Sequence, residues 1–448
     1  MARAFPPGPP LPSVAQAGLV LLNQTWFIQA CHRRYGDVFA IRIPRIGTLV
    51  YLGDPDHIRA VTRGNPTIYR GGEAAAPLGQ VLGTKSLIML DEDQHKRSRG
   101  MMLPAFHGDS VRRQIAEMIA ITAGEIARWP VGVRFPVYPR MRKLTLEIIL
   151  RTVIGVQAED RLAALRVALP PMMEIGTPLE LIPPPRALLR FGMWRRRAAH
   201  RARALALLND EITRCRTDPA LEARDDALAM LVRSVDGTGT PMADDELADQ
   251  LVTLLLAGHD TMATALSWAL ERLTRHPELL ARTAEAAATG DDAWLDAVCK
   301  ETLRARPVLF EFARKLSAPV RLGGYELPAG VIVAPSINLV HRDARYYPDP
   351  DEFRPQRFLG QRPDPAIWLP FGGGVRRCLG ATFAQVEMRT VLREILRGVE
   401  LAPTMAPDEP VRPRHVTMVP RQGAVVAVRR RLTDDGCVTV THHHLESD

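Results

Sequence analysis

Cysteine and lysine are both scarce in this chain. The 448 residues hold five cysteines, none of them in a CxxC pair, which argues against zinc sites and a disulfide framework and favours a reducing, cytoplasmic compartment. Lysine occurs only at positions 85, 96, 143, 300 and 315, so arginine carries nearly all of the positive charge in a chain whose net charge is +8. The basic residues are dispersed and lack interleaved aromatics. This pattern argues against nucleic-acid binding and favours a basic patch that docks an acidic partner protein.

Long apolar runs, repeats and linkers are absent as well. The apolar stretch from Leu19 to Ala30 is interrupted by Asn23, Gln24 and Gln29, so we expect no membrane span. Without a linker to divide the sequence, we predict a single domain over residues 1–430. Residues 431–448, with three consecutive histidines at 442–444, are expected to be a tail that is disordered or was added for expression.

Hydrophobic spacing predicts a mainly α fold with small β-sheets. Apolar residues recur at three- and four-residue intervals from Asp91 to about Leu303, with helix breaks expected at Pro130, at Pro170-Pro171 and at 183–185. Short strands are predicted at Val38–Ile43, Leu49–Leu52, Val320–Leu322, Tyr325–Leu327 and Val331–Ala334.

Three helices matter for function. One is predicted from a cap at Asp244 to about Arg275, and a second from a cap at Asp291 or Asp292 to Arg304. A third should follow Cys378, over Leu379 to Arg397, with the cysteine in its first turn.

Cys378 differs from the other cysteines in what surrounds it. Three glycines at 372–374 and two arginines, Arg376 and Arg377, precede it. A helix N-terminus and two cations favour the thiolate, so we predict a permanently ionised sulfur, and the glycines would let the backbone approach a flat ligand. An inert core cysteine is the ordinary alternative. A nucleophile would need a general-base histidine, for which no local signature exists, so a metal or cofactor ligand is favoured.

The long helix contains a weak point at Ala257-Gly258, followed by Asp260 and Thr261. Glycine costs a helix about 1 kcal/mol relative to alanine, which suggests that something approaches the backbone there. One interpretation of the next two residues is a surface aspartate beside a threonine bonded to its i−4 carbonyl. The other is proton delivery to a ligand held against the helix.

Glu301 and Arg304 place opposite charges on one helix face. An exposed pair of this kind is commonplace and contributes little. A second arginine, Arg357, follows in a proline-punctuated loop. Together the three residues predict a buried Glu-Arg-Arg network.

These motifs resemble those of the cytochrome P450 family, the haem-thiolate monooxygenases. The family's three patterns are matched at Phe371, Gly374, Arg376, Cys378 and Gly380; at Ala257, Gly258, Asp260 and Thr261; and at Glu301 and Arg304. The resemblance also covers residues 95–99, Arg314 and residues 341–358, and thus most of the chain. It implies the cytochrome P450 fold, with the haem between the long helix and the cysteine loop.

The resemblance also implies roles for individual residues. Cys378 would be the ligand of the iron in haem b, and Thr261 and Asp260 would supply the protons that O–O cleavage consumes. The other contacts to the cofactor would come from Ala257, Gly258, Phe371 and Gly372, and from four cations that meet the propionates: His95, Arg99, Arg314 and Arg376. The implied activity inserts one atom of O2 into a hydrophobic small molecule.

Two positions depart from the family pattern. Met262 follows the helix threonine, where a second hydroxyl residue is frequent, and Gln356 replaces the glutamate that is common before the second arginine. Neither departure touches the cysteine or the acid–alcohol pair.

The substrate region is less well defined. The apolar, proline-broken stretch from Pro170 to Trp194 is either a structural loop or a flexible lid suited to a lipophilic substrate. Leu309, Phe310 and Phe312 are candidate wall residues or core, and Glu311 among them could face the pocket or turn away.

Electrons are expected from a separate ferredoxin or flavodoxin, because the chain shows neither a flavin nor a nicotinamide domain. Arg97, Arg99, Arg376 and Arg377 would form the landing surface for it. A peroxygenase, an isomerase and a non-catalytic haem sensor or carrier are the alternatives. The Asp260-Thr261 pair disfavours all of them, since none needs a proton relay.

Overall fold

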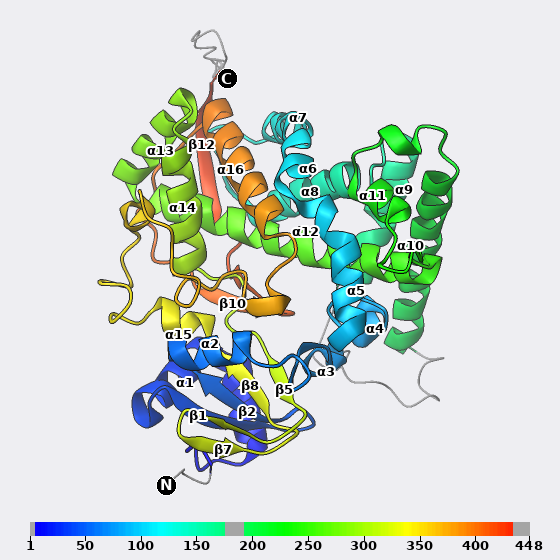
Figure 1. The fold of residues 1–448 in the computed structure, drawn as a ribbon. Helices are drawn as coiled ribbons and strands as arrows, with labels where there is room; N and C mark the ends of the chain where they lie inside the picture. The colour runs from blue at the N-terminus through cyan, green and yellow to red at the C-terminus, as the bar shows by residue number, and fades with distance from the viewer. Residues whose placement is uncertain (1–4, 175–191, 433–448) are drawn as a thin grey trace.

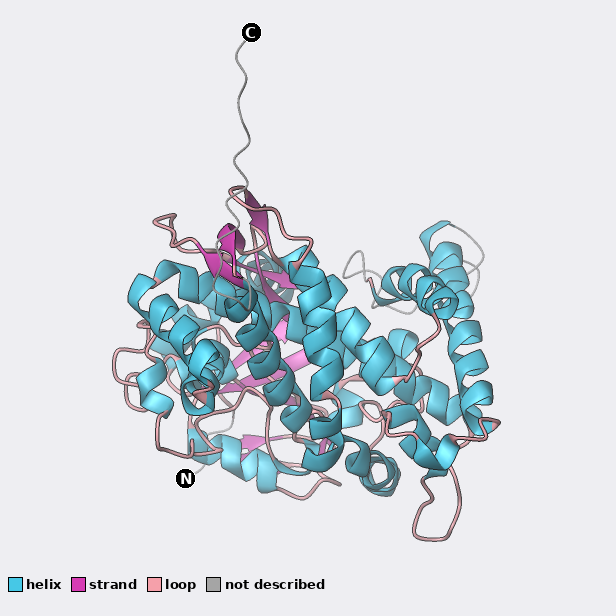
Figure 2. Cartoon of the chain, turned by 90° about the horizontal axis from the view of Figure 1, so that it is seen from above, coloured by secondary structure: helices cyan, strands magenta, loops and turns pink. Residues whose placement is uncertain are grey.

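The computed structural model of the chain describes residues 5–174 and 192–432. Helices dominate these ranges, as predicted, and the strands form small sheets (Figures 1 and 2). The predicted lid at 170–194 lies largely outside the described residues, and so does nearly all of the predicted tail.

The N-terminal part is built on a five-stranded sheet in the order β1-β2-β8-β5-β3. Its strands are β1 (Val38–Ile43), β2 (Gly47–Leu52), β3 (Tyr69–Arg70), β5 (Arg314–Leu316) and β8 (Ile332–Pro335), with α1 (Ser13–Tyr35), α2 (Pro55–Arg63) and α15 (Ile337–His341) beside it. On the inner side of α1, Phe27 and Cys31 are buried in one cluster with Phe39, Ile41 and Tyr51 of the sheet. Strands from residues 38–70 and 314–335, far apart in the sequence, therefore share this sheet.

The helical body surrounds one long helix, α12 (Asp244–Arg275), which crosses the centre of the molecule (Figure 1). Most of its residues are buried, since it packs against α8, α14, α16 and β11. The other helices of this body are α3 (Gly71–Ala74), α4 (Gly79–Leu82), α5 (Glu92–Met102), α6 (Gly108–Arg113), α7 (Ile115–Ile126), α8 (Tyr138–Ile148), α9 (Glu159–Met173), α10 (Gly192–Arg216), α11 (Ala227–Arg233), α13 (Pro277–Thr289), α14 (Asp292–Ala305) and α16 (Ala381–Gly398).

Three further small sheets complete the described part. They are β6 (Val320–Leu322) with β7 (Tyr325–Leu327), β10 (Val411–Arg414) with β11 (Thr417–Pro420), and β4 (Arg134–Pro136) with β12 (Val425–Arg431) and β9 (Val399–Leu401). The indole N–H of Trp268 on α12 donates to the carbonyl of Met418 at 2.8 Å. This bond fixes the β10–β11 hairpin against the long helix.

Several predicted boundaries hold and others fail. The predicted bounds of β1, β6, β7 and the end of α12 are confirmed. Asp244 is not a cap, because Ala243 precedes the helix and Asp244 lies in its first turn, whereas Asp291 caps α14 by accepting from the Trp294 N–H at 3.0 Å. The break predicted at Pro170-Pro171 is wrong: α9 runs through both prolines, which fall in its last turn.

Other corrections concern the ends of elements. The helix after the cysteine begins at Ala381 rather than Leu379, so Cys378 lies before its first turn. Arg431, assigned to the tail, is the last residue of β12 and donates to the carbonyls of Ile126 and Trp129 at 2.9 and 2.8 Å. The short strands β3, β4, β5 and β9–β12 were not predicted.

Candidate functional site

The cysteine loop owes its shape to glycines and to a contact with α2. Gly372 and Gly374 adopt positive φ angles of 64° and 67°, a region that side chains disfavour. A Cβ on Gly374 would lie 1.9 Å from the carbonyl oxygen of Thr62, and one on Gly373 would lie 2.9 Å from its methyl group. Gly374 is thus required by packing on the backbone of α2, and Gly373 lies against a side chain of the same helix, so these two glycines have a packing role besides the expected approach of a flat ligand.

Cys378 is exposed, whereas the other described cysteines, Cys31, Cys215 and Cys299, are buried. Its backbone N–H donates to the carbonyl of Phe371 at 2.9 Å, closing the turn. Although the residue is accessible, surrounding protein atoms desolvate the thiol and raise its pKa, against the opposing effect of the Gly380 N–H, Arg377 and Arg99. The prediction of a sulfur ionised by its surroundings alone is therefore wrong, and a bound cation would be needed to hold the thiolate.

One stripe of α12 is accessible although the helix is otherwise buried. Ala257 is exposed, and Leu254, Gly258 and Thr261 are partly so; the spacing of these residues places them on one face. A Cβ on Gly258 would lie 2.9 Å from the side chain of Ile149. That atom is the flexible end of the isoleucine, so the contact favours glycine without requiring it, while the accessible stripe leaves space beside Ala257 and Thr261.

Asp260 and Thr261 point in different directions. The Thr261 hydroxyl donates to the Ala257 carbonyl at 2.5 Å, which confirms the i−4 bond weighed above. Asp260 is not a surface residue: its side chain is 13% exposed and accepts from the Tyr138 hydroxyl at 3.1 Å. Arg142 lies 3.3 Å from one Asp260 oxygen and Arg414 3.7 Å from the other.

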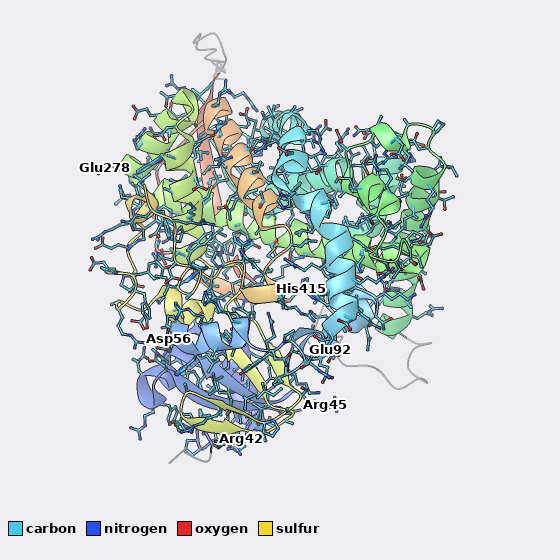
Figure 3. All side chains as sticks on the ribbon, in the orientation of Figure 1. Arg42, Arg45, Asp56, Glu92, Glu278 and His415 are labelled. Carbon is cyan, nitrogen blue, oxygen red and sulfur yellow. The ribbon has the colours of Figure 1, made fainter. Side chains whose placement is uncertain are left out.

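The ion pairs of Asp260 extend to the end of α9. The carboxylate of Glu174 pairs with Arg142 at 3.2 Å and with Arg414 at 2.9 Å, and His415 lies 3.9 Å from Asp260. Figure 3 shows His415 near the middle of the molecule. Sequence reasoning missed Tyr138, Arg142 and Arg414, since they come from α8 and the β10–β11 hairpin and carry no local motif.

Four residues predicted to be cations come together beside the cysteine loop. We call His95, Arg99, Arg314 and Arg376 the cation cluster. His95 is buried, and its pKa is lowered to about 4 by desolvation and by the nearby Arg376, Arg99 and Arg314. Desolvation also lowers the pKa of Arg99. Desolvation and the positive charge of Arg376 lower the pKa of Arg314 to about 10. These mutual effects show that the four side chains share one partly buried region.

Asp91 is the carboxylate that faces this group. It forms an ion pair with Arg376, and it accepts from the backbone N–H groups of Gly71, Gly72 and Glu73 at 2.9 Å, at the start of α3. Among the described residues no ion pair is formed by Arg99 or Arg314. Three arginines and one acid leave an excess of positive charge, which fits a ligand that carries two carboxylates.

The Glu-Arg-Arg network is confirmed as a buried brace. Glu301 and Arg304 are fully buried and joined by two hydrogen bonds of 2.7 and 2.8 Å. Arg357 lies 3.3 Å from the same carboxylate, and the Arg354 backbone N–H donates to it at 2.8 Å. With Gln356 in place of a second acid, Glu301 is the one carboxylate of the network and pairs with both Arg304 and Arg357.

His341 connects the brace to the cysteine loop. Its Nε2 accepts from the Leu369 N–H at 3.0 Å, and its Nδ1 lies 3.2 Å from the Arg304 carbonyl. Since Nε2 accepts, Nδ1 carries the proton and donates. Desolvation lowers the pKa of His341 to about 3, so this neutral tautomer persists.

The structure shows where Glu311 points and whether Arg97 is free to meet a partner protein. Glu311 turns toward α1, where Gln24 donates to it at 2.7 Å, and desolvation raises its pKa to about 7. Arg97 is not available to a partner, because it pairs with Asp236 at 2.6 Å and Glu246 at 3.0 Å.

Arg376 is likewise engaged with Asp91. Arg377 remains exposed, with its guanidinium 5.9 Å from the centre of the Phe371 ring.

Comparison with known proteins identifies the family. The cytochrome P450 family profile matches residues 6–427. The chain is 51% identical to cytochrome P450 135B1 of Mycobacterium tuberculosis over 434 residues, covering 96% of this chain and 92% of that protein. It is 41% identical to cytochrome P450 135A1 of the same species over 428 residues, 95% of either chain.

Solved structures show the same fold. A cyanobacterial cytochrome P450, CYP120A1, whose structure has retinoic acid bound, superposes with a TM-score of 0.82 at 23% identity over 96% of this chain and 100% of that one. The haem domain of cytochrome P450DA superposes with a TM-score of 0.81 at 23% identity, over 98% and 100%. Within the described residues no helix is long and apolar enough to cross a membrane. The chain belongs to the cytochrome P450 family, and it is accordingly a haem-dependent monooxygenase with the mainly α fold predicted from its sequence.

Proposed function

We propose that this enzyme inserts one atom of O2 into a hydrophobic small molecule in the cytoplasm, using haem b and electrons from a separate ferredoxin and its reductase. The observation that carries the proposal is the exposed Cys378 beside a cation cluster with too little negative charge. A haem presents both an iron for the sulfur and two propionates for the cations.

The chain's residues would divide the binding of the haem between them. Cys378 would hold the iron through its sulfur. His95, Arg99, Arg314 and Arg376 would bind the propionates, and Arg376 would then share its charge between a propionate and Asp91. Phe371 and Gly372 would contact the haem from the cysteine side and Ala257 and Gly258 from α12. Bound in this way, haem supplies the reductive activation of O2.

Thr261 and Asp260 would handle protons. The Thr261 hydroxyl lies on the accessible stripe and donates to Ala257, so it can accept a hydrogen bond from a ligand or pass its proton on. Asp260 is held away from that stripe by Tyr138 and Arg142. Its carboxylate would take protons from the outer side and deliver them along α12 toward the Thr261 oxygen.

Carbon monoxide difference spectra of the reduced protein test the ligand. We expect the strongly red-shifted Soret band of cysteinate-ligated ferrous haem in the parent, and its loss in Cys378→Ala. Cys299→Ala, at a buried cysteine, is the matched control and should keep the band. Retention of the band in Cys378→Ala would remove Cys378 from its proposed role.

Coupling measurements test the reaction. With O2 and a surrogate ferredoxin system, Thr261→Ala should lower product formation and raise peroxide release. A matched substitution at Thr264, whose hydroxyl donates to the Asp260 carbonyl on another face of α12, should change coupling less. Equal coupling in Thr261→Ala and the parent would contradict the proton role.

The donor is proposed to dock on the cysteine side at Arg377, whose guanidinium is exposed. Arg377→Glu should slow electron transfer from an acidic ferredoxin, and the difference from the parent should shrink as salt is added. Arg97→Gln provides the contrast, because its ion pairs already neutralise it. An unchanged rate in Arg377→Glu would count against this surface.

A further inference from the structure

Helix α1 presents large apolar side chains to solvent. Val14 is 72% exposed, Leu21 61%, Leu22 84% and Trp26 55%. Single exposed apolar residues are ordinary on a protein surface, but several on one helix indicate a binding surface. The helix is kinked at Asn23. Beyond the kink Phe27, Ile28 and Cys31 are buried on the sheet, whereas Trp26 and, before the kink, Val14, Leu21 and Leu22 are left exposed.

The apolar surface continues onto two neighbouring segments. Phe5 and Leu11 are 40% and 39% exposed in the stretch before α1, and Ile46 is 48% exposed at the tip of the β1–β2 hairpin. We call the exposed side chains of these three segments the N-terminal face: Phe5, Leu11, Val14, Leu21, Leu22, Trp26 and Ile46.

Gln16 fixes the three segments relative to one another. Its side-chain amide donates to the carbonyls of Pro9 and Leu11 at 3.2 and 2.8 Å, and its carbonyl oxygen accepts from the Arg42 N–H at 2.9 Å. Gln16 itself is 1% exposed. Because this buried amide is satisfied by both segments, the stretch before α1 and the β1–β2 hairpin are held against the first half of α1.

The charge around this face is of one sign. No aspartate or glutamate occurs from Phe5 to Tyr35. Arg33, Arg34, Arg42 and Arg45 are exposed, and none of them forms an ion pair within the described part of the chain. Figure 3 shows Arg42 and Arg45 at the end of the molecule where the chain begins.

The nearest acid does not neutralise these arginines. Asp37 follows α1, but its carboxylate is paired with His32 at 2.7 Å and with Arg345 at 2.9 Å. The N-terminal face therefore combines exposed apolar groups with unpaired guanidinium groups and has no free carboxylate of its own between Phe5 and Tyr35.

We propose that the N-terminal face binds peripherally to an anionic lipid surface. Leucine and tryptophan side chains would enter the boundary between headgroups and acyl chains while the arginines contact the lipid phosphates, which is how amphipathic surface helices bind membranes. A second copy of the chain is a poorer occupant, because it would bring the same positive charge to the contact. The proposal is independent of the reaction the enzyme catalyses.

Vesicle sedimentation with the haem-loaded full chain tests the proposal. The parent should sediment with vesicles of phosphatidylcholine mixed with phosphatidylglycerol, much less with phosphatidylcholine alone, and less as salt is added. Arg42→Glu/Arg45→Glu should weaken binding at least about 25-fold, since each arginine near an anionic surface contributes about fivefold. Leu21→Ser/Leu22→Ser should weaken binding to the mixed vesicles as well.

Matched variants separate this face from general surface changes. Arg128→Glu/Arg362→Glu reverses two exposed arginines elsewhere. Val131→Ser/Val133→Ser alters two exposed valines next to β12, at the opposite end of the molecule (Figure 1). Both should bind vesicles like the parent. The absorbance spectrum of the bound haem verifies that every variant is folded.

Three results would overturn the proposal: no sedimentation of the parent with mixed vesicles, equal binding to both vesicle types, or equal losses in the matched variants. Light scattering on a sizing column examines the second-copy alternative. A dimer that Leu21→Ser/Leu22→Ser dissociates, in a parent that ignores vesicles, would assign the N-terminal face to self-association.

Discussion

Two charged groups of similar size flank the cysteine loop and are built in opposite ways. In the brace, Glu301 and Arg304 are fully buried, and carbonyls and backbone N–H groups satisfy their remaining positions. In the cation cluster, Asp91 pairs with Arg376, while Arg99 and Arg314 have no ion pair among the described residues. The difference separates a group whose charges are paired within the fold from one that we propose binds a ligand.

The largest effect is expected from breaking the brace. Arg304→Met leaves the buried Glu301 carboxylate without its main partner, which should lower the free energy of unfolding by about 3–5 kcal/mol. Urea unfolding of the purified protein measures the loss. Arg214→Met, in the exposed pair with Asp210, is the control and should leave the free energy of unfolding almost unchanged. Similar losses in the two variants would refute the contrast.

The next largest effect is expected from lowering the pH, which should reduce the free energy of unfolding through His95 of the cation cluster. Folded His95 stays neutral down to about pH 4, whereas the unfolded residue takes up its proton near pH 6.5. The unfolded state binds more protons in this window, so stability falls as the pH drops through it, by up to about 3 kcal/mol, and is unaffected above it. Urea midpoints of the haem-free protein and of His95→Gln, measured from pH 7 to 4, should diverge accordingly.

Haem should diminish that acid dependence, because propionates beside His95 favour its charged form. The haem-loaded parent should therefore lose less stability on acidification than the haem-free chain. An identical slope with and without haem would place the propionates elsewhere.

A smaller effect is expected at the arginines, where the cluster can be divided. Arg99→Met and Arg376→Met should each weaken haem binding by about 10- to 150-fold, the value of one hydrogen bond between charged groups. The two variants should differ in the stability of the haem-free chain. Arg376→Met leaves Asp91 without its ion pair and should lower the free energy of unfolding. Arg99→Met removes a cation that has no ion pair among the described residues and should leave the free energy of unfolding unchanged. Haem titration and urea unfolding measure the two quantities. Equal stability losses would show that Arg99 has a partner after all.

The smallest effect is expected at Tyr138. Tyr138→Phe removes one hydrogen bond to Asp260 and should cost about 1 kcal/mol of stability. By altering how Asp260 is held, it should also raise peroxide release, less than Thr261→Ala does. Product formed per electron pair is the measurement. Parent-like coupling would limit Tyr138 to a structural role.

Local patterns predicted the parts of this molecule that local chemistry determines. The end of α12 at Arg275, the cap at Asp291 and the Glu301–Arg304 pair follow from spacing within one helix or its ends. The cysteine loop was found because glycines, arginines and a cysteine are adjacent in sequence.

Other features depend on contacts between distant segments, which no single pattern records. Gly374 is required by the backbone of Thr62, and Gly258 lies against the side chain of Ile149, so both glycines have packing neighbours that the sequence did not reveal. The thiol pKa was predicted in the wrong direction because arginines and a helix were counted while desolvation depends on the whole surrounding fold. Asp260 was paired with Thr261 by adjacency, yet its partners lie on α8 and a hairpin.

The contact between Gly374 and Thr62 has a consequence for protein engineering. The turn that presents Cys378 rests with its backbone directly on the backbone of α2, more than 300 residues earlier in the chain. A haem-protein designer who transplants residues 371–380 into another scaffold would carry over the proposed metal ligand without the surface that shapes its loop. The transferable unit is this loop together with the end of α2.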